Sequence, residues 1–363
     1  MKRPILSGIG PFAVGTLVLI VLAGIVIRGR DADRIDRSLS ILSLVSSLRR
    51  ASAVGELEVA RSDALLWSRF GGIRESMVAL ENAWAAMGPD GAHLMERLYV
   101  HENPYPEQGR HLLADPGDGS RYSAIHRELQ PRIGEFLGIH EYANILLVNP
   151  SGRVVYSFDK NEAFAADLQQ PHWRETPLGA AVREALDLDP GEIALADFER
   201  YLPGSEEWAL FMAAPIGEHG VLTFRISPER IGKHLARTHQ QRNSASSTIL
   251  ADGYRILGYP PWIDAEETFD PVDVEIHERA LRDGPGSMIL RQADGSRILA
   301  AWEPGTVGGI PWVVVSRVDL SEVRGEESGD RRAIVLVTVL VWLALGALTL
   351  GGGPSPAMAR HRI

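Results

Sequence analysis

ANILLVNPSGRVVYSFDK, residues 143–160, is the stretch of sequence that decides the fold. Two runs of apolar and β-branched residues flank Asn149, Pro150, Ser151 and Gly152. Such runs are typical of β-strands, and a short polar segment with glycine between them is typical of a tight turn. The stretch therefore predicts a β-hairpin, and the segments around it indicate what kind of sheet contains the hairpin.

The neighbouring segments predict an α+β domain. Residues 121–142 have the pattern of a helix that leads into the hairpin, and a second helix is predicted at Gly179–Leu186 within a polar, aromatic stretch. Two further strand-like runs, residues 207–216 and 219–227, follow this stretch with a short turn between them. This order of helix, hairpin, loop and antiparallel strands predicts a central antiparallel sheet.

The same order recurs, more weakly, in the C-terminal half of the chain. Another hairpin is predicted in residues 247–260, and Asp294-Gly295 is a strong signal for a hairpin turn. The remaining helices and strands of this half are predicted at 230–242, 275–283, 287–304 and 310–320. We therefore expect two similar α+β modules in series.

An apolar segment stands near each end of the chain. No residue from Pro4 to Ile27 is charged, and a second uncharged run covers Ala333–Gly353. About twenty apolar residues span a bilayer as a helix, so we predict transmembrane helices at 9–28 and 333–351. A cleaved signal peptide is the alternative for the first segment, and a buried core helix is the alternative for the second.

Two spans would place both chain ends on one side of the membrane. Basic residues near the ends indicate that this side is the cytoplasm, namely Lys2, Arg3, Arg360 and Arg362. The signal is imperfect, because basic residues also flank the spans on the other side, at Arg28, Arg30, Arg331 and Arg332. This topology leaves nearly the whole chain between the spans outside the cytoplasm.

The segment after the first span predicts a long amphipathic helix. Its apolar residues recur at spacings of three and four, at Ile35, Leu39, Leu42, Val45 and Leu48. The pattern continues with breaks toward Leu98, and a helix of about 40 residues is roughly 60 Å long. Such a helix has to bury its apolar stripe against a domain, against a second copy of the chain, or against both.

Composition argues against several classes of protein. The chain has 363 residues, a net charge of −10 and no cysteine. The negative charge argues against nucleic-acid binding, and the lack of cysteine excludes disulfides, a thiolate nucleophile and zinc-thiolate sites. The sequence has no Walker loop, no Gly-x-Gly-x-x-Gly motif and no complete nucleophile elbow, and its 11 histidines show no metal-binding spacing. We therefore expect neither an enzyme nor a cofactor or metal site.

The layout of span, long helix, two sheet modules and span resembles the double Cache sensor domain. This PAS-like ectodomain occurs in bacterial chemotaxis receptors, sensor histidine kinases and cyclases. The motifs that carry the resemblance are, in order, RLYVHENPYP, YSAIH, LLVNPSGRVVYSFDK, LADFERYLP, WALFMAAPI, LADGYRILGYP and AAWEP…WVVVSRVDLSEV, within residues 30–330. The resemblance implies that the hairpin begins a five-stranded antiparallel sheet, which floors a small-molecule pocket roofed by the following loop.

The chain departs from the pattern of this family in places that concern the ligand and the output. Members of the subfamily usually have Tyr-Tyr-Asp at 142–144 and Phe-Lys-Glu at 159–161, and the change to Asn144 removes a charge. The Arg-x-Trp-Tyr signature of amino-acid-binding members is absent, and the nearest text is His172-Trp173-Arg174. No output domain follows the second apolar segment, so we expect a truncated receptor or a stand-alone sensor subunit.

Seven residues are candidates for the pocket of the first module, because a polar metabolite needs donors and acceptors between aromatic walls. They are Tyr156, Asp159, Lys160, Trp173, Asp197, Tyr201 and Phe211. Asp197 would pair with a ligand ammonium group and Lys160 with a ligand carboxylate. The structural alternative is a Lys160–Asp197 ion pair, with Phe211 in the core. Strand alternation places Tyr156 and Asp159 on opposite faces, so one pocket takes all seven only if a bulge intervenes.

These patterns predict a two-pass protein of the bacterial inner membrane that senses a small molecule in the periplasm. We expect a homodimer that passes its signal to a missing output domain or to a separate cytoplasmic signalling protein. The alternative is a membrane-anchored scaffold that binds a protein partner and no metabolite. The predicted divisions are a cytoplasmic N-terminus (1–8), a first span (9–28), a long helical region (29–100), a membrane-distal module (101–230), a membrane-proximal module (231–330), a second span (333–351) and a short cytoplasmic tail (352–363).

Overall fold

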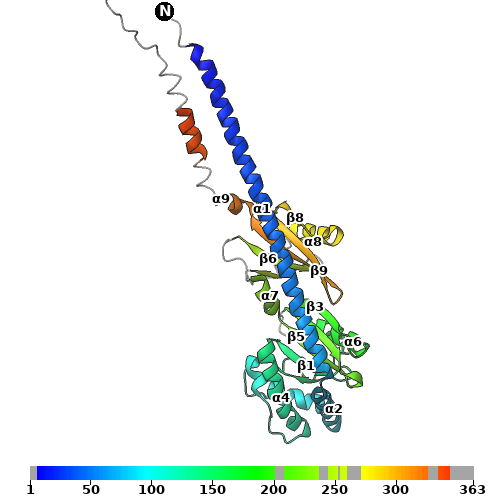
Figure 1. The fold of residues 1–363 in the computed structure, drawn as a ribbon. Coiled ribbons are helices and arrows are strands. Elements are labelled where there is room, and N and C mark those ends of the chain that lie inside the picture. The colour runs from blue at the N-terminus through cyan, green and yellow to red at the C-terminus, as the bar shows by residue number, and fades with distance from the viewer. Residues whose placement is uncertain are drawn as a thin grey trace, which may run out of the picture.

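The computed structural model describes residues 6–200, 208–236, 244–251, 254–259, 271–325 and 334–343. Figure 1 shows an elongated molecule in which one helix lies along two α+β modules that are stacked end to end. This helix, α1 (Leu6–Arg69), has 64 residues and continues without a break as far as Phe70. We call the module far from the chain ends the distal module and the module nearer to them the proximal module.

One stripe of α1 is buried against both modules. Its members recur at spacings of three and four residues, at Leu42, Ser46, Arg49, Ala53, Leu57, Ala60 and Ala64. The predicted stripe is therefore wrong in part, because Leu42 is buried whereas Leu48 is 57% exposed. The helix carries two apolar stripes, and the sheets pack against the one whose small side chains allow a close approach.

The distal module contains a five-stranded antiparallel sheet in the order β2-β1-β5-β4-β3. Its strands are β1 (Asn144–Val148), β2 (Val154–Ser157), β3 (Ala194–Arg200), β4 (Trp208–Pro215) and β5 (Val221–Ile226). The predicted hairpin is β1–β2, and Gly152 supplies the positive φ of 84° that its turn requires. The sheet that the resemblance implied is thus confirmed, including β3, which the strand pattern alone did not indicate.

Helices cover both faces of the distal sheet. They are α2 (Gly71–Ala86), α3 (Gly91–Glu96), the π-helix η1 (Arg97–His101), the 3₁₀-helices η2 (Glu107–Leu112) and η3 (Gly217–His219), α4 (Arg121–His140), α5 (Pro171–Arg174), α6 (Pro177–Leu186) and α7 (Pro228–Ala236). Ser120 caps α4 by accepting a hydrogen bond from the Ser123 amide at 3.1 Å. The last of these helices, α7, leads into the proximal module.

The alternation of side chains along each strand divides the distal module into two cores. We call the face that packs against α1, α2 and α4 the rear face of the sheet and the other face the front face, whatever the view. Ile145 and Leu147 of β1 lie on the rear face. On the front face, Leu146 and Val148 pack with the segment that contains α5 and α6. Residues of β1 therefore alternate between the two cores, whereas Val155 and Tyr156 of β2 both join the rear core, where the pairing register shifts.

The proximal module repeats the distal sheet, with the strand order β7-β6-β10-β9-β8. Its elements are β6 (Ser246–Ala251), β7 (Tyr254–Tyr259), α8 (Pro271–Asp283), β8 (Gly286–Arg291), β9 (Arg297–Val307), β10 (Ile310–Asp319) and α9 (Leu320–Gly325). The predicted turn at Asp294-Gly295 joins β8 to β9, with Gly295 at a φ of 87°. Two similar modules in series are therefore confirmed, and α1 packs against β9 and β10 of the second.

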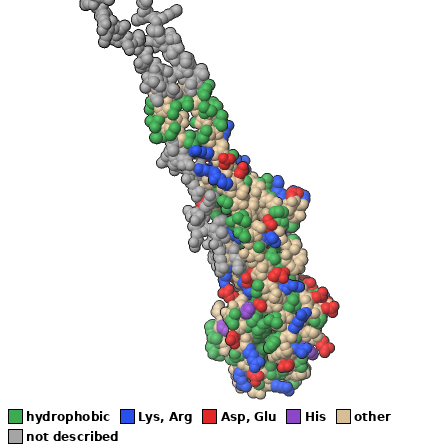
Figure 2. Space-filling view, in the orientation of Figure 1, with side chains coloured by type: hydrophobic (Ala, Val, Ile, Leu, Met, Phe, Trp, Pro, Cys, Tyr) green, Lys and Arg blue, Asp and Glu red, His purple; other side chains and the backbone are tan. Residues whose placement is uncertain are grey.

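The apolar ends of the chain are described in part. No helix within the described residues is long and apolar enough to cross a membrane. The predicted spans at 9–28 and 333–351 extend outside the residues whose side chains are described, and the predicted tail at 352–363 lies wholly outside them. Residues 334–343 are helical and lie beside α1, where the Trp342 indole donates a hydrogen bond to Thr16 Oγ1 at 2.9 Å. Figure 2 shows that hydrophobic side chains gather on this narrow end of the molecule.

Candidate functional site

A cluster of buried polar side chains lies on the front face of the distal sheet. Asn144 begins β1, Ser157 ends β2, and Arg225 lies opposite Asn144 near the end of β5. Thr223 precedes Arg225 by two residues on the same strand and shares its face. Asp159 follows β2 and completes the front cluster, which we define as Asn144, Ser157, Asp159, Thr223 and Arg225.

Asp159 is the centre of the hydrogen bonds in the front cluster. Its Oδ1 accepts from Asn144 Nδ2 at 2.5 Å, from Ser157 Oγ at 2.8 Å and from the Asn161 amide at 3.2 Å, while Oδ2 accepts from Asn161 Nδ2 at 3.2 Å. Burial raises the pKa of Asp159, and the Ser157 hydroxyl and the Arg225 guanidinium act in the opposite direction. The carboxylate is thus held in one position by the hairpin and its own loop.

Arg225 and Thr223 supply donors to the same face. Arg225 is 8% exposed, and its Nη1 lies 3.9 Å from Asp159 Oδ2. Thr223 is fully buried, and its hydroxyl has no hydrogen-bond partner among the described residues. A buried hydroxyl without a partner costs about 1–3 kcal/mol, so its presence on this face is a departure from ordinary core packing.

Apolar side chains surround the front cluster. Phe211 lies opposite Arg225 in the β4–β5 pairing and is fully buried. Trp173, from α5, belongs to the same front core, together with Leu178 from α6. The segment that follows the hairpin therefore covers this face of the sheet, as the resemblance implied for a roofing loop.

Tyr156 and Lys160 point away from the front cluster. The Tyr156 hydroxyl donates to Gln130 Oε1 of α4 at 2.7 Å, so this side chain lies in the rear core. Lys160 is fully buried with a φ of 53°, and its ammonium group donates to the Phe158 carbonyl oxygen at 3.1 Å. Burial lowers the pKa of Lys160 to about 7, and burial together with the charge of Lys160 lowers the pKa of His126 to about 3.

Asp197 lies at the junction of the two modules. Both of its carboxylate oxygens lie 3.1 Å from Trp312 Nε1 of β10, whose indole N–H is the donor. The Trp312 ring also lies 6.1 Å from the ring of Phe198, measured between centroids. Gly308, in the β9–β10 turn, contacts Leu195 so closely that a Cβ there would come within 2.8 Å of Leu195 Cδ2. The β9–β10 hairpin therefore packs against β3 of the distal module.

The seven predicted residues thus separate into groups. Asp159, Trp173 and Phe211 share the front face, Tyr156 and Lys160 face the rear, and Asp197 lies at the junction. Tyr201 lies outside the described residues. The pattern missed Thr223 and Arg225, although an arginine two residues after a threonine in the strand-like run 219–227 is a signal of polar groups on one face.

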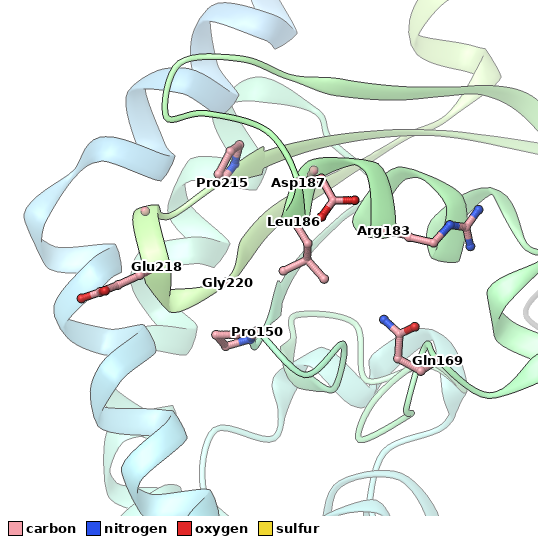
Figure 3. A pocket seen from close by; sticks show the side chains of 10 residues that line it. Pro150, Gln169, Arg183, Leu186, Asp187, Pro215, Glu218 and Gly220 are labelled. Carbon is pink, nitrogen blue, oxygen red and sulfur yellow. The ribbon is translucent and has the colours of Figure 1, made fainter.

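A cavity of about 360 Å³ lies at the opposite end of the distal sheet (Figure 3). Its lining residues come from the turns of the sheet and the end of α6, and they are Pro150, Gln169, Arg183, Ala185, Leu186, Asp187, Pro215, Gly217, Glu218 and Gly220. Arg183 and Glu218 extend from opposite sides of the cavity and away from one another in Figure 3. Its charged groups do not converge, so the cavity lacks the polar arrangement of the front cluster. Among the described residues no group of three or more His, Asp or Glu side chains could hold a metal ion.

The chain was compared with family models, with curated proteins and with solved structures, and similar proteins were found among the solved structures. No family model matches it, and no curated protein matches it significantly. It is similar to the periplasmic sensory domain of the Campylobacter jejuni chemoreceptor Tlp1, with 12% identity over 80% of this chain and 98% of that one, at a TM-score of 0.46. It is also similar to the ligand-binding domain of the Pseudomonas aeruginosa PAO1 amino acid chemoreceptor PctB in complex with L-Arg, with 15% identity over 77% and 95%, at a TM-score of 0.40.

A third similar structure is an extracellular ligand-binding receptor from Desulfohalobium retbaense DSM5692, with 15% identity and a TM-score of 0.35. This likeness covers 66% of the present chain and 39% of the receptor. Other similar structures are extracellular domains of histidine kinases. These neighbours are sensory or ligand-binding domains that are described as periplasmic or extracellular.

Trp312→Phe is expected to loosen the junction between the modules. The variant keeps an aromatic ring but removes the donor to Asp197, and a hydrogen bond to a charged group contributes about 1.5–3 kcal/mol. Urea unfolding of the full chain, followed by circular dichroism, should show a lower free energy of unfolding and a separation of the modules into two transitions. Trp302→Phe is the control, because the Trp302 indole donates to Gly284 within the proximal module. Equal effects of the two substitutions would contradict a role of Asp197 in holding the modules together.

Lys160→Met is expected to change the pH dependence of stability. The pKa of Lys160 is about 7 in the folded chain and 10.5 for an unperturbed lysine. Between these values the unfolded state binds more protons, so the native protein gains stability as pH rises, by at most about 1.4 kcal/mol per pH unit from this group. Below pH 7 the Lys160 amine is protonated in both the folded and the unfolded state, so the full cost of burying its charge lowers the free energy of unfolding.

The measurement is the free energy of unfolding of wild type and variant at pH 6.5, 8 and 9.5. The advantage of Lys160→Met over the wild type should shrink as pH rises. Lys233→Met, which removes an exposed lysine of α7, is the control for the loss of a lysine. Parallel curves for wild type and Lys160→Met would show that burial does not hold the Lys160 amine in its neutral form.

Proposed function

We propose that the distal module binds a small molecule on the front face of its sheet, beneath the segment that contains α5 and α6. The observation that carries this proposal is the front cluster, in which buried polar groups converge beside Phe211 and Trp173. Small-molecule sites combine a largely apolar lining with a few placed polar groups. The buried Thr223 hydroxyl, which has no partner among the described residues, adds a polar group to this face.

We also propose that the chain is anchored in the bacterial inner membrane, with both modules in the periplasm. Large apolar side chains are exposed on residues 17–26 of α1 and on residues 335–343, at the end of the molecule where α1 begins. Exposed apolar helices are costly in water and stable in lipid. In this arrangement α1 and the segment after α9 would carry movement of the modules toward the cytoplasm.

A second copy of the chain is the proposed partner of α1. Ile41, Leu44 and Leu48 are 60%, 61% and 57% exposed on the side of α1 that faces away from the sheets. Their spacing of three and four residues is that of a helix–helix seam. Two copies would bury these side chains against each other and bring two sensory modules into one unit.

The proposed sensor passes its signal to a cytoplasmic signalling module, which lies outside the two sensory modules. We assign no catalytic role to the modules. The competing hypothesis is an extracytoplasmic scaffold that binds a protein partner without a metabolite. A scaffold needs no buried polar cluster beneath a covered sheet face, and this is why the sensor is preferred.

The sensor hypothesis is tested by thermal unfolding of the full chain in detergent against amines, amino acids, other carboxylates, carboxamides and purines. A ligand at 100 times its Kd stabilises the folded state by about 2.7 kcal/mol. We expect at least one class to raise the melting temperature, and Phe211→Ala to abolish the shift. A folded chain that responds to no member of the panel would favour the scaffold.

A single substitution tests both the location of the modules and the dimer. Leu44→Cys introduces one thiol into a chain that has no cysteine. In intact cells a membrane-impermeant oxidant should cross-link two chains, because the thiols at position 44 would face each other across the seam. Ser46→Cys is the control, because Ser46 is fully buried and its hydroxyl donates to the Ala301 carbonyl oxygen at 2.9 Å. Cross-linking of Leu44→Cys only after cell lysis would contradict the periplasmic location, and a monomer after oxidation of the lysate would contradict the seam.

A further inference from the structure

One arginine of α1, Arg49, is buried and has no counter-ion among the described residues. It is 2% exposed, and its Nε, Nη1 and Nη2 atoms have no hydrogen-bond partner in the part of the chain that the structure describes. Burial lowers the pKa of Arg49 to about 10, so its guanidinium keeps the positive charge at neutral pH. A buried charge without a partner strongly destabilises a folded protein, so this group indicates an ion that the folded chain binds.

The other arginines that are buried within the described residues each lie beside a carboxylate. They form the pairs Arg225–Asp159 at 3.9 Å, Arg230–Glu56 at 2.7 Å and Arg317–Asp273 at 2.6 Å. These three arginines are between 6% and 8% exposed, so Arg49 is the most deeply buried of the four. The described part of the chain therefore supplies a carboxylate to each buried guanidinium except that of Arg49.

Arg49 belongs to the stripe of α1 that is buried against the sheets (Figure 1). One turn earlier, the Ser46 hydroxyl donates to the Ala301 carbonyl oxygen of β9 at 2.9 Å. On the neighbouring flank of the helix, Arg50 Nε lies 3.7 Å from Glu303 Oε1 of β9. Because helical side chains lean toward the N-terminus of their helix, the side chain of Arg49 leans back toward the level of Ser46 and Ala301.

The row of the proximal sheet that contains Ala301 has short and polar side chains. Ala301 lies opposite Ser316 of β10, and Ser316 lies opposite Ser247 of β6. Both serines are fully buried, and their hydroxyl oxygens lie 2.8 Å apart. This contact uses one of the two hydroxyl hydrogens, so the other is available to a further acceptor. Larger side chains occupy the adjoining rows of this face, at Leu299, Val318, Glu303, Val314 and Ile249.

We propose that Arg49 binds a small, planar, monovalent oxyanion between α1 and the proximal sheet. The planar guanidinium matches such an ion through two parallel hydrogen bonds, and the serine row offers a further donor. A single charge is expected, because Glu303 balances Arg50 and only Arg49 is left to be compensated. The bound ion would stabilise the contact of α1 with β9 and β10, in a module separate from the front cluster.

The ion is expected to come from solution rather than from a lipid headgroup. In the proposed membrane arrangement, the apolar part of α1 ends at Ile27. Arg49 follows about 22 residues later, which corresponds to roughly 33 Å along the helix. The headgroup layer adds only about 5–8 Å on each side of the hydrocarbon core, so Arg49 lies well beyond it. Small water-soluble ions are therefore the appropriate probes.

The test is thermal unfolding of the full chain in detergent, in a zwitterionic sulfonate buffer to which one sodium salt at a time is added. The probes are formate, bicarbonate and nitrate. Chloride and sulfate are the comparison anions, because chloride has no planar fork of oxygens and sulfate carries two charges. At 100 times its Kd, a planar probe should raise the melting temperature by about 3–5 °C and the rise should saturate, whereas chloride and sulfate should give no saturating rise.

Variants locate the ion. Arg49→Met removes the guanidinium at similar length and should abolish the saturating rise. Without added anion this variant should unfold at a higher temperature than the wild type, because it lacks the uncompensated buried charge. Arg50→Met is the matched control on the next residue and should keep the rise, since Arg50 is half-buried and lies beside Glu303. Arg49→Lys keeps the charge but loses the planar fork, so it should bind the ion about 10-fold more weakly, and it replaces Arg49→Met in the comparison if that variant does not fold.

Three results would overturn the inference. Equal and non-saturating effects of all anions on the wild type and on Arg49→Met would show a general effect of salt and no site. A saturating rise with chloride or sulfate as large as that with the planar ions would exclude the proposed class of ion. A lower melting temperature of Arg49→Met without added anion would show that Arg49 already has a partner in the folded chain. None of these results concerns the front cluster, which lies in the distal module.

Discussion

The packing of α1 is the constraint on which the rest of the structure depends. A helix of 64 residues extends over roughly 96 Å at 1.5 Å per residue, which is more than one small sheet can cover. Its buried stripe continues from Leu42 to Ala64, and the core that contains Ala53 and Leu57 also contains Trp312 and Val314 of the proximal module. Two sheets in series along one helix follow from this, and so does a rigid connection between the distal end of the molecule and its apolar end.

The duplication of the sheet gives an internal comparison that a single module could not provide. Equivalent strands have the same order and register, so differences between the modules are differences of side chains on a common frame. The proximal front face holds the buried Arg317–Asp273 pair, whereas the distal front face holds Arg225, Thr223 and a carboxylate that accepts from neighbouring donors. The two modules thus differ in the polar side chains that they place on the same face of the same sheet.

The junction between the modules connects the site with the path toward the chain ends. Asp197 and Phe198 contact Trp312, and both follow Ala196, which lies opposite Phe211 in the β3–β4 pairing. The register of the β3–β4 pairing shifts between Ala196 and Glu199, so β3 departs from regular pairing where it meets the proximal module. Strand β3 therefore contacts both Phe211 of the distal front face and Trp312 of β10.

Sequence pattern predicted the order of the elements well, because alternation and turn residues are local signals. It predicted the hairpins, α4, α6 and α8, and the resemblance supplied the five-stranded antiparallel sheet of the distal module, but neither supplied the order of the strands. The sequence pattern identified only part of the buried stripe of α1. The helix has two apolar stripes, and tertiary packing decides which of them is buried. The pattern also grouped Lys160 and Asp197 with Asp159, because the positive φ of Lys160 and the contact of Asp197 with the other module depend on structure far away in sequence.

The most direct test of the account is a crystal structure of the full chain with a compound that raises its melting temperature. The account predicts electron density for that compound on the front face of the distal sheet, between Arg225, Thr223 and Phe211, with the segment of α5 and α6 above it. Density for the compound in the proximal module, in the cavity between Pro150 and Glu218 or on α1 would contradict the central claim that the front cluster is the binding site.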